Sequence, residues 1–138
     1  MSFELLEHPG DAKLRARGET LEDAFSGVVD AVSALVGGTG IDGPETTREV
    51  ELAARNPEAL LFDFLDRLIL FQDLEDVVVT RATALAIEET DDGVRLSATL
   101  HGVAIPPDRT LLDVKAPTYS EMRIEENAEW VIEAVLDL

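Results

Sequence analysis

The chain has 138 residues, no cysteine, and 29 Asp plus Glu against 11 Lys plus Arg, so its formal net charge is -18. This length predicts one domain spanning residues 1–138, in which about two thirds of the surface of the unfolded chain can be buried. The hydrophobic content of 46% excludes an acidic disordered tail. The lack of cysteine excludes disulfides, thiolate zinc sites and cysteine nucleophiles.

The sign of the charge restricts the partners. DNA- and RNA-binding proteins hold phosphates with clustered Lys and Arg, whereas the lysines here are Lys13 and Lys115 alone. We therefore expect no direct nucleic-acid binding. Strong acidity with so few lysines also suits concentrated salt, which screens self-repulsion, and it predicts a halophilic protein whose melting temperature rises in molar KCl.

Targeting signals and membrane spans are not evident. No apolar run approaches the roughly 18 residues that cross a bilayer, and the first residues lack the basic flank of a secretory signal. We expect a cytoplasmic protein with no membrane partner.

Alternation of apolar and polar residues predicts strands at residues 3–7, 13–17 and 48–53. Pro9 and Gly10 mark a loop between the first two strands. Asp11 is therefore expected where this loop meets the second strand.

Two amphipathic helices are expected from apolar residues at helical spacing. The first begins after Thr20, its expected N-cap, and stops at residues 37–38, which are both glycine. The second begins at Asn56, which is followed by a proline, and is expected to end near Gln72.

A β-hairpin is the clearest pattern of the C-terminal half. Alternating residues at 77–88 and 94–100 flank an Asp-Asp-Gly turn. Three further short strands are expected at 111–115, 119–125 and 130–136. Because helices and strands do not alternate strictly, we predict a single α+β domain with two amphipathic helices packed on a mainly antiparallel or mixed β-sheet.

Candidate chemistry rests on carboxylates, since nucleotide-binding, zinc-protease and serine-hydrolase motifs are lacking. Asp11 adjoins a glycine in a tight loop, and Asp137 and Leu138 follow the last apolar strand. If that strand is held in the sheet beside the loop, Asp11, Asp137 and the terminal carboxylate of Leu138 could bind Ca²⁺ or Mg²⁺. The alternatives are a turn aspartate bonded to its own backbone and a solvated chain end.

Residue types that are rare in this chain are further candidates for function. Lys115 stands in an otherwise lysine-poor chain, although a local salt bridge would explain it equally well. Tyr119 and Trp130 are expected to anchor packing. His8 and His101 are too few for a histidine-rich metal site, and at least one is expected to be an ordinary hydrogen-bonded or surface residue.

Three segments, in order, resemble the archease family over essentially the whole chain. They are the opening residues 3–8 with Asp11, the run V-K-A-P-T-Y at 114–119, and the closing residues 130–138. The leucine-rich second helix fits as well. The sequence departs from the family pattern at Pro9 and Gly10, which replace Thr-Ala, and at Thr110 and Ser120, which replace histidines.

This resemblance implies an α+β fold and a non-enzymatic role. Archeases assist the RtcB-type RNA ligase of tRNA splicing by promoting its guanylylation by GTP and its turnover. The metal-binding acids of the family correspond to Asp11 and Asp137, with Leu138 nearby, and its required lysine corresponds to Lys115. The implied cofactor is a divalent metal ion, Ca²⁺ first, with Mg²⁺ or Mn²⁺ as alternatives, and Lys115, Tyr119 and His8 are expected to face the partner.

Two other functions stay open. Asp11 and Asp137 could form the acid/base pair of a carboxylate-based hydrolase. A chaperone-like protein-binding module would need an exposed apolar patch, whereas the apolar stripes of this sequence alternate with polar residues and are expected to be core.

Overall fold

The computed structural model of the chain describes residues 2–6 and 10–138. This part forms two helices and seven strands. They are β1 (Ser2–Leu6), β2 (Asp11–Gly18), α1 (Leu21–Val36), β3 (Glu45–Ala54), α2 (Pro57–Glu75), β4 (Val77–Thr90), β5 (Gly93–Ala104), β6 (Ala116–Glu126) and β7 (Trp130–Asp137). The α+β prediction is confirmed.

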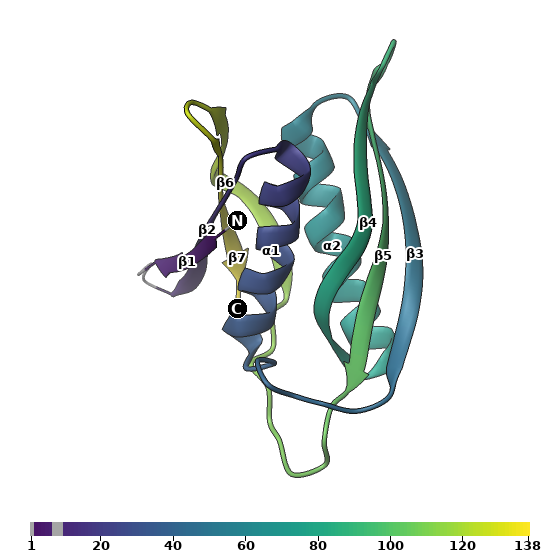
Figure 1. Cartoon of the computed structure of the whole chain (residues 1–138). Coiled ribbons are helices and arrows are strands. Elements are labelled where there is room, and N and C mark those ends of the chain that lie inside the picture. Colours follow the sequence, from purple (N-terminus) through teal and green to yellow (C-terminus); the bar gives the residue numbers. More distant parts are fainter. Residues whose placement is uncertain (1, 7–9) are drawn as a thin grey trace.

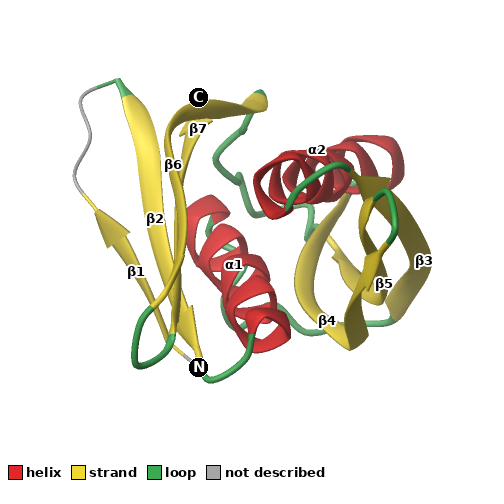
Figure 2. Ribbon diagram, turned by 90° about the horizontal axis from the view of Figure 1, so that it is seen from above, coloured by secondary structure: helices red, strands yellow, loops and turns green. Residues whose placement is uncertain are grey.

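The strands form two sheets rather than one. One sheet has the order β1-β2-β7-β6 and the other the order β3-β5-β4, and the strand pairs between described residues are antiparallel. Figure 1 and Figure 2 show both helices lying between the two sheets. The middle layer therefore buries apolar side chains on two sides. Among the described residues, neither helix is long and apolar enough to cross a membrane.

Helix α1 begins and ends as the sequence predicts. The hydroxyl of Thr20 accepts a hydrogen bond of 3.0 Å from the backbone N–H of Asp23, which satisfies one free donor of the first turn. Gly37 ends the helix with φ 91°, a left-handed conformation that glycine adopts without a steric penalty.

Helix α2 begins as predicted but ends later. The side-chain oxygen of Asn56 caps the helix by accepting a hydrogen bond of 2.8 Å from the backbone N–H of Ala59. The helix continues to Glu75, three residues beyond the predicted end at Gln72. Its C-cap is Asp76, with φ 51°. Aspartate tolerates this left-handed conformation better than most residues, and without a glycine no stop signal was visible in the sequence.

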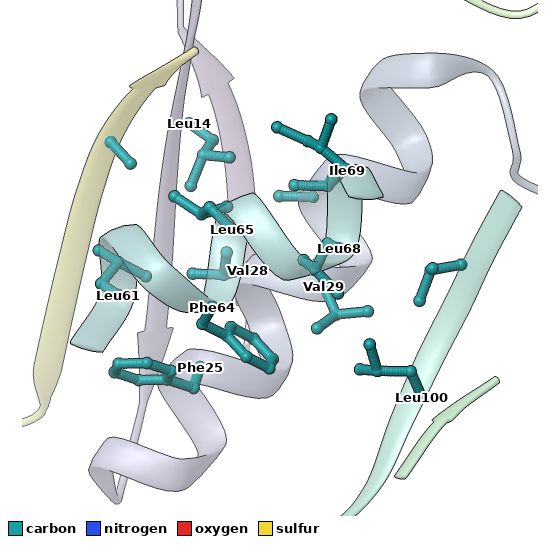
Figure 3. Close-up of a cluster of buried hydrophobic side chains, with 14 of the residues drawn as sticks. Leu14, Phe25, Val28, Val29, Leu61, Phe64, Leu65, Leu68, Ile69 and Leu100 are labelled. Atoms are coloured by element: carbon teal, nitrogen blue, oxygen red, sulfur yellow. The ribbon is translucent and has the colours of Figure 1, made fainter. Parts of the chain in front are cut away.

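The core is continuous through the three layers. Figure 3 shows Leu14 of β2 on one side and Leu100 of β5 on the other, with side chains of both helices between them. At the centre the rings of Phe25 in α1 and Phe64 in α2 lie with centroids 5.7 Å apart. Both rings are fully buried, so the contact between the helices is part of the same core that the sheets cover.

One predicted strand, at 111–115, is wrong. This segment belongs to the loop between β5 and β6, although Val114 is buried and Leu111 packs against the core. The N–H of Leu112 donates to the carbonyl of Val36 at 3.1 Å. The alternation in this segment reports burial of side chains beside the helices, not pairing in a sheet. The predicted strands at 119–125 and 130–136 are confirmed within β6 and β7.

Candidate functional site

Asp11 and Asp137 lie directly opposite each other. Asp11 is the first residue of β2, Asp137 is the last residue of β7, and the antiparallel register pairs them. Opposite residues of such a pair hold their Cβ atoms about 4.5–5.5 Å apart on one face of the sheet. Asp11 is half-buried and Asp137 is exposed, so two carboxylates separated by almost the whole sequence meet at one end of the inner strands, where solvent can reach them.

Lys115 lies on the other side of Asp137. Its backbone N–H donates to the carbonyl oxygen of Asp137 at 2.9 Å, and the next residue, Ala116, pairs with Asp137 in the register of β6 and β7. The ammonium group of Lys115 is exposed and makes no ion pair with the residues that the structure describes. The local salt bridge that would make Lys115 ordinary is therefore not seen, and the backbone of a lysine adjoins the strand end that carries Asp137.

The same face of this sheet carries an ion-pair network around one buried carboxylate. Glu133 in β7 is 7% exposed and receives two contacts from the guanidinium of Arg15 in β2, at 2.7 and 2.8 Å. Arg123 of β6 approaches the other carboxylate oxygen at 3.3 Å. Lys13, between Asp11 and Arg15 on the same face, pairs with Glu121 at 3.2 Å. These contacts connect the strands β2, β7 and β6 next to the aspartate pair.

The electrostatics of Glu133 follow from this network. Burial alone would raise the pKa of the Glu133 carboxyl, but the hydrogen bond from Arg15 and the nearby positive charges, Arg123 first, hold that pKa below its usual value. Glu133 was missed in the sequence. Its signal was a single charged residue in the middle of an otherwise apolar strand, because such a residue needs a partner when it is buried.

Folding lowers the pKa of the Glu133 carboxyl. Ionised Glu133 therefore stabilises the fold at any pH above the pKa that this carboxyl has in the unfolded chain. This stability is lost as the pH falls through the pKa that it has in the folded protein. We expect Glu133→Gln to lower the free energy of unfolding by about 1–3 kcal/mol at pH 7. The difference from wild type should shrink in acid. Urea denaturation from pH 7 to pH 3 measures it, with Glu125→Gln as control, since Glu125 is exposed and pairs with the same Arg123. Parallel pH profiles for wild type and Glu133→Gln would contradict the assignment.

The other predicted site residues have different placements. Tyr119 is not core: it is 51% exposed, and its ring stacks on Phe62 of α2 with centroids 4.4 Å apart. Trp130 is half-buried and packs against the core. His8 lies outside the described residues. Leu138 follows β7 and is 36% exposed.

Tyr119 leaves the core because β6 is irregular at this point. Four residues, 119–122, stand opposite the single residue Ala134 of β7, and Glu121 has φ 56°. Bulges of this kind redirect side chains. Nothing in the sequence indicated the bulge, because the apolar character of tyrosine predicted only burial.

His101 lies in β5, in the other sheet from the aspartate pair. Its Nε2 is 2.7 Å from the hydroxyl of Thr83, while its buried Nδ1 has no hydrogen-bond partner among the described residues and faces a Glu45 oxygen at 3.5 Å. The structure therefore does not bring His101 to the candidate site.

The two aspartates alone do not make a complete metal site. Hard oxygen donors suit Ca²⁺, Mg²⁺ or Mn²⁺, and carboxylates facing each other repel unless a cation lies between them. Within residues 2–6 and 10–138, however, no group of three or more His, Cys, Asp or Glu side chains is placed to hold a metal. Asp11 and Asp137 could supply at most two ligands to a cation, and water or further oxygen atoms would have to complete the shell.

Two grooves in the described part of the chain lie away from this pair. A groove of about 630 Å³ is lined by α1, the loop after it and β4, with Asp30 and Arg81 among its residues. Burial raises the pKa of the Asp30 carboxyl. A second groove, of about 500 Å³, lies over β3 and β5. Neither is lined by Asp11 or Asp137.

Two helices enclosed between antiparallel sheets, with a pair of cross-strand carboxylates at the end of two inner strands and no hydrolase or nucleotide motif, define the class as a small α+β protein. Comparison with known sequences then places the chain. The sequence profile of the Archease protein family matches residues 3–138. The chain belongs to the archease family.

Relatives cover the full length. Protein archease of Pyrococcus abyssi is 32% identical over 140 residues, which cover 99% of this chain and 98% of that protein. Protein archease of Thermococcus kodakarensis is 34% identical over the same length, with the same coverage.

Solved structures agree. The solution structure of Methanobacterium thermoautotrophicum protein 1598 has a TM-score of 0.81 at 29% identity and covers 99% of this chain and 98% of its own. The crystal structure of a Thermotoga maritima archease, described as a possible chaperone, has a TM-score of 0.63 at 18% identity. It covers 96% of this chain and 94% of its own. At that identity it supports the fold alone.

Proposed function

We propose that this chain is a non-enzymatic, metal-binding accessory protein that activates an RtcB-type RNA ligase in tRNA splicing. In this proposal it promotes GTP-dependent guanylylation of the ligase and its repeated turnover. Family membership gives the setting. The observation that carries the proposal is the cross-strand pair of Asp11 and Asp137, with Lys115 bonded to the same strand end.

Each group has a role that its chemistry supports. Asp11, Asp137 and Leu138 would hold a divalent cation, Ca²⁺ first, with Mg²⁺ or Mn²⁺ as alternatives. When bound, this cation would supply positive charge at a site that meets phosphate oxygens. Lys115, exposed beside it, would contact the partner or the phosphates of its nucleotide, as an ammonium group suits such oxygens.

The overall charge supports an accessory role. A protein with a net charge of -18 is repelled by RNA phosphates but attracted to the basic surface that an RNA ligase must present to its substrate. It could therefore bind the ligase while the RNA is absent and leave when the RNA arrives.

The test is reconstitution with purified ligase, GTP and Mn²⁺, with ligase–GMP as the measured product. We expect the protein to increase the rate of ligase–GMP formation, and Lys115→Ala to lose most of this increase. Arg55→Ala is the matched control, because Arg55 is also an exposed cation without an ion pair to the described residues. An unchanged rate with added wild-type protein would defeat the proposal.

The hydrolase alternative gains no support, since the two grooves described above are not lined by the aspartate pair. The chaperone-like alternative needs an exposed apolar patch, and it was disfavoured because every apolar stripe was expected to be core. That expectation is wrong for α2, where Leu70 and Leu74 are exposed.

A further inference from the structure

Helix α2 carries leucines that the fold does not bury. Leu70 and Leu74 are 47% and 65% exposed, whereas most apolar residues of the same helix lie buried between the two sheets. Residues four apart share one face of a helix, one turn from each other. α2 contacts β6 of one sheet and β3 of the other, and it lies along an open side of the sandwich (Figure 2). The two leucines therefore form an apolar strip on the outside of the molecule.

Acidic residues border this strip on one side. Asp63, Asp66 and Asp73 are exposed, and they stand seven and four residues before Leu70 and three residues after it. These spacings place them on the same side of the helix. Arg67, which is half-buried, is the only basic residue of α2. The strip thus has an apolar centre and a predominantly negative border.

A fixed aromatic ring packs on the same helix, nearer its N-terminus. Tyr119 of β6 is half-exposed and lies parallel to the ring of Phe62 in α2, with an angle of 7° between the ring planes. Exposed aromatic rings held by a neighbour lose little conformational freedom on binding, which is why tyrosine is frequent among the residues that dominate binding energy.

We propose that Leu70, Leu74 and Tyr119, bordered by Asp63, Asp66 and Asp73, form the surface with which this chain docks on the RNA ligase; this inference rests on the function proposed above. We call this surface the α2 face. Charge complementarity selects the occupant, because an enzyme that holds RNA carries clustered Lys and Arg around its substrate channel. A second copy of this chain is disfavoured, since its own α2 face would bring the same aspartates together.

The test measures the dissociation constant for the purified ligase by biolayer interferometry. We expect Leu70→Ser/Leu74→Ser to weaken binding by at least about tenfold, since apolar residues at the centre of an interface carry much of its affinity. Phe3→Ser/Leu5→Ser is the matched control, with side chains of 39% and 45% exposure on β1 and outside the α2 face, and it should bind within about twofold of wild type.

A charge-reversed variant keeps the inference testable if the leucine variant fails to fold. Asp66→Lys/Asp73→Lys should slow association and reduce its dependence on salt, because charges at the rim of an interface act mainly on the association rate. Asp91→Lys/Asp92→Lys makes the same change in charge at the β4–β5 turn and should associate faster than the α2 variant.

The outcomes separate the two proposals. If wild-type protein neither binds nor activates the ligase, the proposed function and this inference both fall. If wild type binds and the α2 variants bind as tightly as their controls, the docking surface alone is wrong. Sedimentation of wild type as a dimer that Leu70→Ser/Leu74→Ser dissociates would assign the α2 face to a second copy and overturn the inference.

Discussion

Replacing Phe64 with alanine is expected to lower the free energy of unfolding by about 3–5 kcal/mol. Phe64 is fully buried, and its ring contacts that of Phe25 at the centre of the molecule (Figure 3). Because each helix also packs on a sheet, neither can move into the space that the ring leaves without losing contacts behind it. The cavity should therefore persist, which places the loss at the upper end for a core residue.

The measurement is urea denaturation followed by circular dichroism. A domain of this size has a total stability of roughly 5–15 kcal/mol, so a loss of this size should be evident in the midpoint. Leu74→Ala on the same helix is the control: its side chain is 65% exposed, and the change should stay within about 0.5 kcal/mol. Equal losses for the two variants would show that the helices do not share the core described here.

Local signals in the sequence were sufficient for the helices. The caps at Thr20 and Asn56 and the glycine after α1 each act through a hydrogen bond or a φ angle within a few residues, so they are visible in any short window. The end of α2 was misplaced for the same reason. Asp76 ends the helix with a left-handed conformation, and an aspartate there carries no local sign that distinguishes it from the exposed acids before it.

Strand pairing is a non-local property, and the sequence constrained it less. Alternation shows that a segment has one buried side but not which strand lies beside it, so the division into two sheets was not predicted. The segment at 111–115 shows the limit most clearly. Val114 is buried there without any sheet, and burial alone produced the apparent strand pattern.

The candidate site was predicted only in part. The positions of Asp11 and Asp137, each at the end of a strand, suggested that they could meet, but their opposition depends on the pairing of β2 with β7, which no local pattern specifies. Glu133 and the exposed ring of Tyr119 were missed because each depends on contacts across the fold, with Arg15 and with Phe62 respectively.

The second large effect concerns Asp137, and its sign should depend on the cation. Without a divalent cation, Asp11 and Asp137 are like charges opposite each other, so Asp137→Asn should be neutral or slightly stabilising. With a cation at a hundred times its dissociation constant, wild type should gain about 2.7 kcal/mol of unfolding free energy. Asp137→Asn should gain far less, which makes it the less stable protein.

Thermal melts with Ca²⁺, Mg²⁺ and Mn²⁺ measure this reversal, with KCl adjusted to keep the ionic strength constant. Asp92→Asn, in the exposed β4–β5 turn, removes one charge elsewhere and should respond to the cations as wild type does. Asp11→Asn and the double variant complete a double-mutant cycle, in which a shared ion makes the two losses strongly non-additive. If all variants gained equally, the cations would be screening the net charge of -18 and not occupying a site between the two strands.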